Sequence, residues 1–246
     1  QIAELSRRDV SSGYTLDDNA SALAVAALYY GKLGAPTQNP STAREKRQLL
    51  RLINTYLDFI GFVIKPDGHF QNFVKGNRTL DDVRNRQVNL EESNARAIYA
   101  LALTATGSSL PKTIRQKAFN LLQKRMKSGI SFSSPRAIAR CIKALCILVD
   151  RKVQIEGIDL KGTLRSHCDR LVELYQAASH ADWQWFESYL TYSNGVMPEA
   201  LLLGYRATRD ERYLTVGKTT LDFLIKENFV NNIYMPVGQD GWYHQN

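Results

Sequence analysis

Stretches almost free of charge alternate along the chain with stretches that carry a single apolar stripe. Residues 19–30 are nearly all small or apolar and contain no charged residue, whereas residues 43–60 repeat apolar side chains at helical spacing on one face only. A helix that is apolar all round is buried on every side, and an amphipathic helix covers it from the solvent side. We therefore expect helical hairpins, each with an inner and an outer helix. The pattern occurs four times, in the pairs 19–30 and 43–60, 93–106 and 111–127, 134–149 and 161–178, and 193–206 and 210–226.

The spacing of the inner helices distinguishes the two architectures that helical hairpins build. An open α-solenoid repeats at a near-constant length of about 34–45 residues. Here the inner helices begin near residues 19, 93, 134 and 193, so the intervals are unequal. This favours an all-α fold, a closed (α/α) toroid, with residues 1–246 as a single domain. Because a full toroid of this kind has six hairpins and the pattern gives four, we expect an incomplete toroid, truncated at its C-terminal end.

The links that lead into the inner helices combine carboxylates with aromatic residues. All three tryptophans lie in such links, which include D-D-N (17–19), E-E-S-N (91–94) and W-Q-W-F-E (183–187). Inner helices of a toroid run in one direction, so these links should meet at one mouth. Aromatic faces stack on sugar rings, amides and carboxylates bind hydroxyl groups, and glycoside cleavage needs a pair of carboxyl groups. The sequence therefore predicts a cleft that binds a carbohydrate ligand.

Two carboxylates are the leading candidates for catalysis. Glu187 has aromatic neighbours, and burial against such groups raises the pKa of a carboxyl, so Glu187 is the better acid. Asp18, at a helix start, is the better base. The reserve carboxylates are Asp17, Glu92 and Asp240. The expected stacking residues are Trp185, Tyr192, Trp242 and Tyr243, and the expected ligands of sugar hydroxyls are Asn19, Asn72 and Asn194.

The same residues also have structural explanations. Asp and Asn at a helix start are capping residues, which accounts for D-D-N at 17–19 and for the two glutamates at 91–92. Trp183, Trp185 and Phe186 could equally be core aromatics beneath a loop. The case for a site therefore depends on several separate links sharing one composition.

Composition narrows the class of protein without naming it. Lys and Arg exceed Asp and Glu, 32 against 24, and the net charge of +8 is scattered over amphipathic stretches, which favours solvated helix faces over a nucleic-acid surface. No apolar run approaches the roughly 18 residues of a membrane span. No metal-ligand spacing, phosphate loop or dinucleotide fingerprint occurs, so we expect no metal and no cofactor. Cys141, Cys146 and Cys168 are expected to be buried free thiols, which favours a cytoplasmic protein.

The loop motifs resemble those of a known family. The segments are G-Y-T-L-D-D-N-A (13–20), E-E-S-N-A-R-A-I (91–98) and W-Q-W-F-E-S-Y-L-T-Y-S-N (183–194). They are similar, in the same order, to motifs of a bacterial glycosidase-related family whose members occur alone or joined to glycosyltransferases. The resemblance implies a six-hairpin (α/α) toroid, a carbohydrate ligand, and a glycosyltransferase as partner or fused domain. Ser21 and Glu92 depart from the family pattern, which has Arg and Asp at these places.

Four functions remain open at this point. A glycoside hydrolase would use the carboxylate pair, whereas a non-catalytic accessory module of a glycosyltransferase would need only the aromatic and amide groups. A sugar epimerase on the same fold would need paired histidines at the mouth, for which His69 and His244 are the candidates. A helical scaffold for protein partners would show an exposed apolar groove and no convergence of the links.

Overall fold

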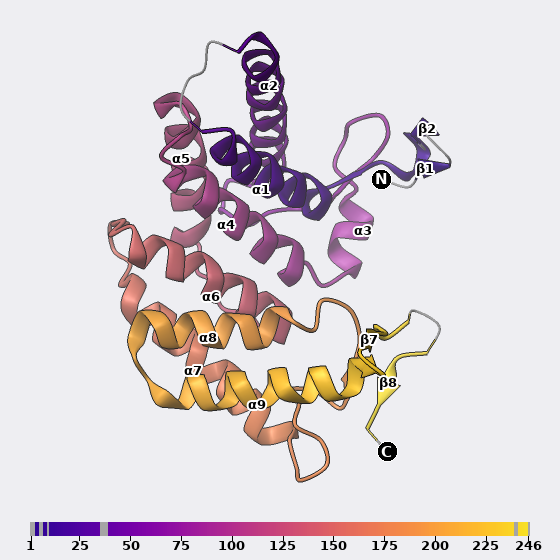
Figure 1. Ribbon diagram of the computed structural model, residues 1–246. Helices are drawn as coiled ribbons and strands as arrows, with labels where there is room; N and C mark the ends of the chain where they lie inside the picture. The colour runs from indigo at the N-terminus through magenta and orange to yellow at the C-terminus, as the bar shows by residue number, and fades with distance from the viewer. Residues whose placement is uncertain (1–2, 5–6, 9, 35–38, 239–240, 246) are drawn as a thin grey trace. The chain divides into compact units, whose positions relative to one another are not determined.

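A computed structural model of the chain describes residues 3–4, 7–8, 10–34, 39–238 and 241–245. Helices dominate the described part, and strands are short (Figure 1). The α-helices are α1 (Leu16–Lys32), α2 (Pro40–Val63), α3 (Asp82–Gln87), α4 (Glu91–Thr106), α5 (Lys112–Lys127), α6 (Pro135–Asp150), α7 (Leu160–Ala178), α8 (Val196–Thr208) and α9 (Glu211–Asn228), and a 3₁₀ helix covers Val10–Ser12.

The described strands are two residues long and form antiparallel pairs. β1 (Ala3–Glu4) pairs with β2 (Arg7–Arg8), β3 (Tyr14–Thr15) with β4 (Phe73–Val74), β5 (Tyr189–Leu190) with β8 (Tyr243–His244), and β6 (Phe229–Val230) with β7 (Ile233–Tyr234). The β3–β4 pair places Thr15 opposite Phe73, and the β5–β8 pair places Leu190 opposite Tyr243. Each of these two pairs fixes a link that precedes an inner helix.

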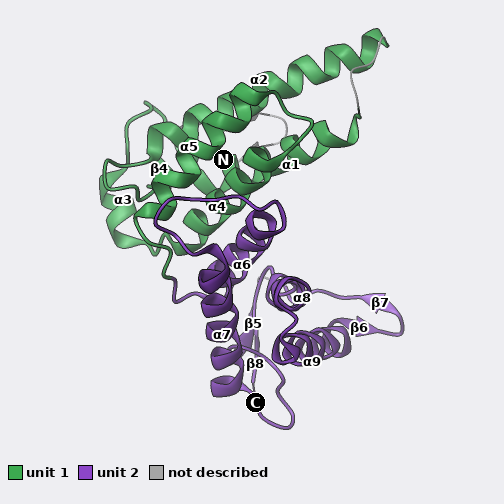
Figure 2. Cartoon of the chain, turned by 90° about the vertical axis from the view of Figure 1, so that its left-hand side faces the viewer, with its two compact units in different colours: residues 1–131 green, residues 132–246 purple. Residues whose placement is uncertain are grey.

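The chain divides into two compact units, unit 1 (residues 1–131) and unit 2 (residues 132–246) (Figure 2). In unit 1, α1 packs on α4, with α2 against α1 and α5 against α4. In unit 2, α6 packs on α8, with α7 against α6 and α9 against α8. The predicted fold class, all-α hairpins with the inner and outer helices of part of an (α/α) toroid, is confirmed within each unit. The single domain spanning residues 1–246 stays a prediction.

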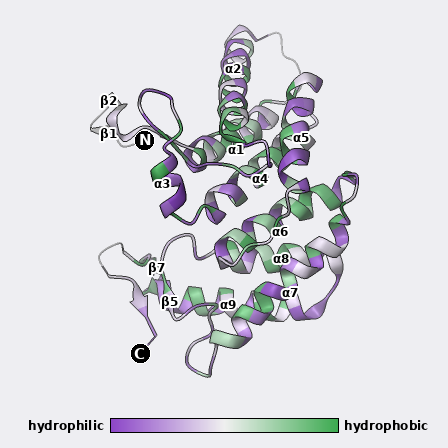
Figure 3. Cartoon of the chain, turned by 180° about the vertical axis from the view of Figure 1, so that it is seen from behind, coloured by the Kyte–Doolittle hydropathy of each residue, from purple (hydrophilic) through white to green (hydrophobic). Residues whose placement is uncertain are grey.

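Burial separates the inner helices from the outer ones, as the charge pattern predicts. Neither α4 over residues 93–106 nor α6 over residues 136–149 has an exposed residue, whereas residues 43–60 of α2 are mostly exposed or half-buried. In Figure 3, α2 shows bands of hydrophilic and hydrophobic residues, as expected of a helix with one apolar stripe. α1 differs from the other inner helices because Val25 and Leu28 are exposed on one side.

The three cysteines are core residues of unit 2, as predicted. All are free thiols and all are buried. Burial raises the pKa of the Cys146 thiol to about 12, and burial likewise raises the pKa of Cys168. The thiols of Cys146 and Cys168 are therefore protonated near neutral pH and pack as small apolar groups.

Within the described residues, no helix is long and apolar enough to span a bilayer.

Candidate functional site

In unit 1, the segment that follows α2 joins the starts of both inner helices. The backbone N–H of Leu16, the first residue of α1, donates to the carbonyl of Asn72, and the N–H of Asp17 donates to the Asn72 side-chain oxygen at 3.1 Å. Two residues earlier, the Phe70 N–H donates to Oδ1 of Asn94 in α4, and Asn94 Nδ2 donates back to the Phe70 carbonyl. The two helices therefore begin at the same place and run in parallel, so D-D-N and E-E-S-N meet.

Buried amides hold this segment in place. Asn85 of α3 accepts hydrogen bonds from the N–H groups of Asn72 and Phe73, and donates to the Phe73 carbonyl. Asn94 also accepts a hydrogen bond from Nε of the buried Arg125. Asn72 is itself buried, and its side-chain oxygen is engaged with α1. The observed contacts of Asn72 are thus structural, while its contact with a sugar stays a prediction.

The carboxylates at the start of α1 differ in their surroundings. Burial alone would raise the pKa of Asp18. A hydrogen bond from the Thr15 hydroxyl at 2.8 Å and nearby positive charges, among them Arg96, outweigh this effect, so that the pKa of Asp18 is lowered overall. Asp18 is therefore ionised, as a base must be. The Asp17 Oδ1 atom is buried and has no hydrogen-bond partner among the described residues. Asn19 donates to the Thr15 carbonyl, which is a helix-start contact.

Glu92 lies half-buried in the first turn of α4. The helix pairing thus brings Glu92 and the two aspartates to the same end of unit 1. The predicted partner carboxylate, Glu187, lies in unit 2, so a single cleft shared by Asp18, Glu92 and Glu187 stays a prediction.

In unit 2, the W-Q-W-F-E aromatics form core rather than surface. Trp183, Trp185 and Phe186 are buried, and Trp185 is 0 % exposed. The Trp183 ring meets Phe223 of α9 edge-on, with centroids 5.1 Å apart, and its Nε1 donates to the Glu187 carbonyl at 2.6 Å. With no exposed face, Trp185 does not offer a stacking surface for a sugar in this structure. The explanation as core aromatics beneath a loop describes these side chains.

The C-terminal aromatics are arranged differently. Trp242 and Tyr243 are exposed, next to the β5–β8 pair. Trp242 stacks on Tyr189 with centroids 5.5 Å apart, and Tyr243 stacks on Trp183 at 5.8 Å. Their other surfaces are free to meet solvent or a ligand. Asp240, the remaining carboxylate candidate, lies outside the described residues.

Arg136, which is not among the site residues expected from the sequence, is the central charged group at the start of α6 in unit 2. It is the second residue of α6 and only 4 % exposed. Its Nη1 donates to Glu187 Oε2 at 2.6 Å, and its Nε donates to the Tyr192 carbonyl at 2.8 Å. Its Nη2 donates to Thr191 Oγ1 at 2.5 Å and to Asn194 Oδ1 at 3.1 Å. An adjacent guanidinium favours the charged form of Glu187, the opposite of what a general acid requires.

A signal for Arg136 was present in the sequence. A cation in the first turn of a helix is opposed by the positive end of the helix dipole. Residues 134–149 contain Arg140 and Lys143 besides Arg136 but no acidic residue, and an inner helix is buried on all sides. A basic residue at that place therefore requires an anionic or strongly accepting partner nearby.

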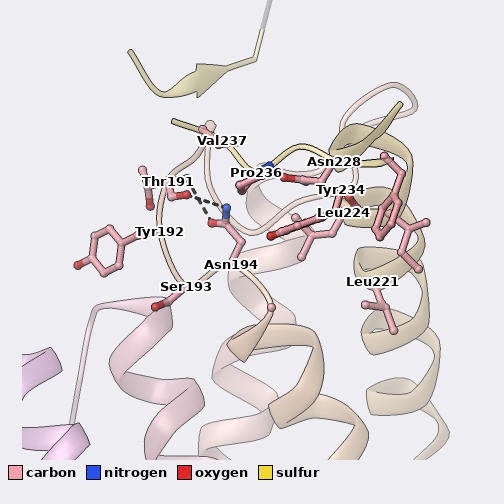
Figure 4. A pocket seen from close by; sticks show the side chains of 13 residues that line it. Thr191, Tyr192, Ser193, Asn194, Leu221, Leu224, Asn228, Tyr234, Pro236 and Val237 are labelled. Atoms are coloured by element: carbon pink, nitrogen blue, oxygen red, sulfur yellow. Dashed lines mark hydrogen bonds between the residues drawn. The ribbon is translucent and has the colours of Figure 1, made fainter. Parts of the chain in front are cut away.

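A pocket of about 360 Å³ opens between the link before α8 and helix α9 (Figure 4). We name it the α8-start pocket. Asn194 stands on one side of it, held by hydrogen bonds to Thr191, while the ring of Tyr192 points away from α9. The described residues that line the α8-start pocket include no charged side chain; they are Thr191, Tyr192, Ser193, Asn194, Gly195, Leu221, Leu224, Ile225, Asn228, Phe229, Tyr234, Pro236 and Val237.

The backbone at the rim of the α8-start pocket is unusual. Ser193 has φ 51°, in the left-handed region that non-glycine residues rarely adopt. Such a conformation persists only where surrounding contacts hold it, and it is found often at ligand sites.

Among the described residues, no three His, Cys, Asp or Glu side chains gather into a group that could hold a metal ion.

Comparison with known proteins adds a distant likeness. No family model matches the chain, and no curated protein matches it. Among solved structures, the chain is similar to "Crystal structure of GH family 9 endoglucanase J30", with 14% sequence identity and a TM-score of 0.40. The match covers 92% of this chain and 59% of that chain. This chain therefore spans about three-fifths of that structure, and a likeness at this level assigns it neither a reaction nor a residue.

Proposed function

We propose that the chain binds a neutral glycan in the α8-start pocket. The observation that carries the proposal is the lining of the pocket, which joins polar groups to apolar and aromatic surface without a charged side chain. Sugar rings offer the same combination, hydroxyl groups at the edge and C–H groups on the face. The volume of about 360 Å³ lies within the range of small-ligand sites.

Each wall of the α8-start pocket has a role in this proposal. Tyr234 is 60 % exposed and its ring lies 5.4 Å from that of Phe229, so the two rings offer a surface for the C–H face of a sugar. The opposite wall carries the Asn194 amide, whereas the Ser193 hydroxyl points away from α9 and accepts a hydrogen bond from Arg140 at 3.3 Å. Tyr192, predicted as a stacking residue, lines the pocket but turns its ring outward, toward Arg136. Its stacking role passes to Tyr234.

Binding without cleavage is the form of the proposal that the contacts favour. Glu187 is the predicted acid, but its carboxylate already accepts a hydrogen bond from Arg136 at 2.6 Å, an arrangement that suits an anchor for Arg136 better than a proton donor. The chain then acts as a sugar-binding module, and its catalytic partner, a glycosyltransferase in this proposal, is a separate or fused protein. A hydrolase remains the alternative, because Asp18 is ionised and carries the charge of a base.

The test is direct binding of neutral oligosaccharides, measured by calorimetry. Moderate salt screens the net charge of +8, so that an acidic oligosaccharide used for comparison is not attracted unspecifically. We expect Tyr234→Ala to weaken binding about tenfold, since the loss of about 1.4 kcal/mol of stacking corresponds to that factor. Tyr29→Ala, which removes an exposed tyrosine of unit 1, is the matched control and should leave affinity unchanged. A uronic-acid oligosaccharide of equal length should bind more weakly.

Three results would count against the proposal. These are the absence of binding to any neutral glycan, equal effects of Tyr234→Ala and Tyr29→Ala, and preference for the acidic oligosaccharide. Release of reducing sugar by the unaltered chain would favour the hydrolase instead, and loss of that release in Asp18→Asn would then locate the base.

A further inference from the structure

Arg136 contacts the α8-start pocket only through the link that forms one wall. Its guanidinium reaches the Thr191 hydroxyl, the Tyr192 carbonyl and the Asn194 side-chain oxygen, and its charge lies 5.2 Å from the centre of the Tyr192 ring. Arg136 is not among the residues that line the pocket. Any effect of Arg136 on a ligand therefore passes through residues 191–194.

The contacts of Arg136 fix a conformation that the link would not keep alone. The left-handed backbone at Ser193 is strained for a residue with a side chain. Asn194 opposes this strain by accepting from the Thr191 N–H and donating to the Thr191 carbonyl, which closes the link on itself. Arg136 then fastens the closed link to α6. The rigid fork of a guanidinium suits such multiple contacts, and a lysine supplies only a point charge.

Glu187 is the anionic partner of Arg136. Its carboxylate is 13 % exposed and accepts from Arg136 Nη1 at 2.6 Å. Because a buried cation is costly without an anionic partner, Glu187 allows Arg136 to stay where it reaches the link. The backbone carbonyl of Glu187 is also held, by Trp183 Nε1. Glu187 is thus anchored at both its main chain and its side chain.

We infer that Arg136 is a positioning residue for the α8-start pocket, and that Glu187 acts by holding Arg136 rather than by transferring a proton to a ligand. The inference rests on the proposed function, because it concerns the affinity of the same pocket. On this inference, Glu187 and Arg136 together hold residues 191–194 in place. We therefore expect changes in the two charged residues to affect ligand affinity as one unit.

The experiment is a double-mutant cycle on glycan affinity, using the full chain and the neutral oligosaccharide that the unaltered chain binds best. Arg136→Gln should weaken binding tenfold or more, and Glu187→Gln should weaken it by a smaller factor. The double variant should bind no more weakly than Arg136→Gln alone, since Glu187 has nothing left to hold. Arg136→Lys should restore part of the affinity, a rescue that general loss of stability does not produce.

An ion pair between α6 and α8 supplies the control. Lys143 of α6 meets Glu199 of α8 at 2.7 Å and does not line the α8-start pocket. Lys143→Gln should leave glycan affinity unchanged. If Arg136→Gln does not fold, Arg136→Lys and Thr191→Val carry the test, because Thr191→Val removes one accepting group and keeps the shape of the side chain.

The possible results distinguish a failure of the positioning role of Arg136 from a failure of glycan binding itself. Unchanged affinity in Arg136→Gln, or effects of Arg136→Gln and Glu187→Gln that add up in the double variant, would overturn the positioning role while leaving glycan binding intact. Equal weakening by Lys143→Gln would also overturn it, because a remote ion pair would then matter as much. Absence of glycan binding by the unaltered chain would overturn both claims.

Discussion

In both units, an irregular link is held by hydrogen bonds at the start of an inner helix, but the groups that make these bonds differ. Unit 1 relies mainly on amides, with Asn94 bonded to Phe70 and to the buried Arg125, and with Asn85 bonded to the backbone of Asn72 and Phe73. Unit 2 uses a charged group, Arg136, with an acid as its counterion.

The difference shows what each device can do. An amide carries one acceptor and one donor group, so it can replace a piece of backbone pairing and be buried without a counterion. A guanidinium reaches several acceptors at once, but its burial carries a desolvation cost that only a well-placed anion offsets. The Asn85 contacts of unit 1 therefore need no charged partner, whereas the Arg136 contacts of unit 2 depend on the anion that accompanies the cation.

The chain carries natural reporters for one side of this comparison. All three tryptophans and all three cysteines lie in unit 2. Tryptophan fluorescence and thiol labelling therefore follow unit 2 alone, whereas far-ultraviolet circular dichroism follows the helices of both units. The same denaturant titration can thus separate the two transitions.

The largest effect is expected from Arg136→Met. Loss of the cation leaves the Glu187 carboxylate without its counterion in a site that is only 13 % exposed. We expect the free energy of unfolding, followed by tryptophan fluorescence in urea, to fall by about 3–5 kcal/mol. A fall below about 1 kcal/mol would show that the link is held without the ion pair, and the contrast with unit 1 would be lost.

The corresponding change in unit 1 is Asn85→Ala. It removes three hydrogen bonds to the backbone of Asn72 and Phe73 and leaves those groups buried without their partner. We expect a loss of about 2–3 kcal/mol, seen by circular dichroism and absent from the tryptophan signal. An equal shift of both signals would mean that the two units unfold as one.

Hydrophobic periodicity located the helices because the pattern is repeated over long stretches. Residues 43–60 were expected to be helical, and α2 covers Pro40–Val63, with Asn39 capping its start. α3 was not expected, because D-V-R-N-R-Q at 82–87 is short and has no apolar stripe. Its role comes from Asn85, whose partners lie on a distant link, and no local pattern encodes that contact.

The candidate site was only partly accessible to sequence reasoning. The meeting of D-D-N with E-E-S-N follows from the common direction of inner helices, which periodicity reveals. Whether an aromatic residue in a link is exposed depends on tertiary packing, so Trp185 and Trp242 could not be told apart in advance. Arg136 was overlooked because basic residues are usually placed at the surface, although its helix position contained the necessary signal.

Alkaline pH should weaken unit 2 more than unit 1. The Cys146 thiol has an ordinary pKa of 9.0, and burial raises it to about 12. The folded state therefore keeps its proton while the unfolded state releases it, so stability is present below pH 9 and is lost as pH rises toward 12. At pH 10 this linkage amounts to about 1–2 kcal/mol.

The measurement is the urea midpoint by tryptophan fluorescence at pH 7 and pH 10, compared with Cys146→Ala. Tyrosines titrate near the same pH in both proteins, so the difference between them isolates the thiol. The same pH dependence in both would contradict a buried, protonated Cys146.

The smallest effect concerns how the inner helices end. α1 is followed by Gly34 at φ 71°, whereas α6 is followed by Lys152 at φ 53°. Glycine adopts this conformation without strain, and a lysine does not. Lys152→Gly should raise the stability of unit 2 by about 0.5–1 kcal/mol, and Gly34→Lys should lower that of unit 1 by about 1 kcal/mol. Opposite signs, measured as shifts in urea midpoint, would remove this distinction between the units.

The two fastenings also set an order of events for a chain made from its N-terminus. The bond from Asp17 to Asn72 spans 55 positions, and the ion pair from Arg136 to Glu187 spans 51. Each span is about one hairpin and its following link, so these two long-range contacts can form only after the next outer helix has been synthesised. A nascent α1 or α6 can pack on its own outer helix before this, but the start of the inner helix lacks its long-range contact until the following link has been synthesised. Folding then proceeds in steps of one hairpin, and a pause in translation shortly before residue 72 or residue 187 would prolong the stage that lacks this contact.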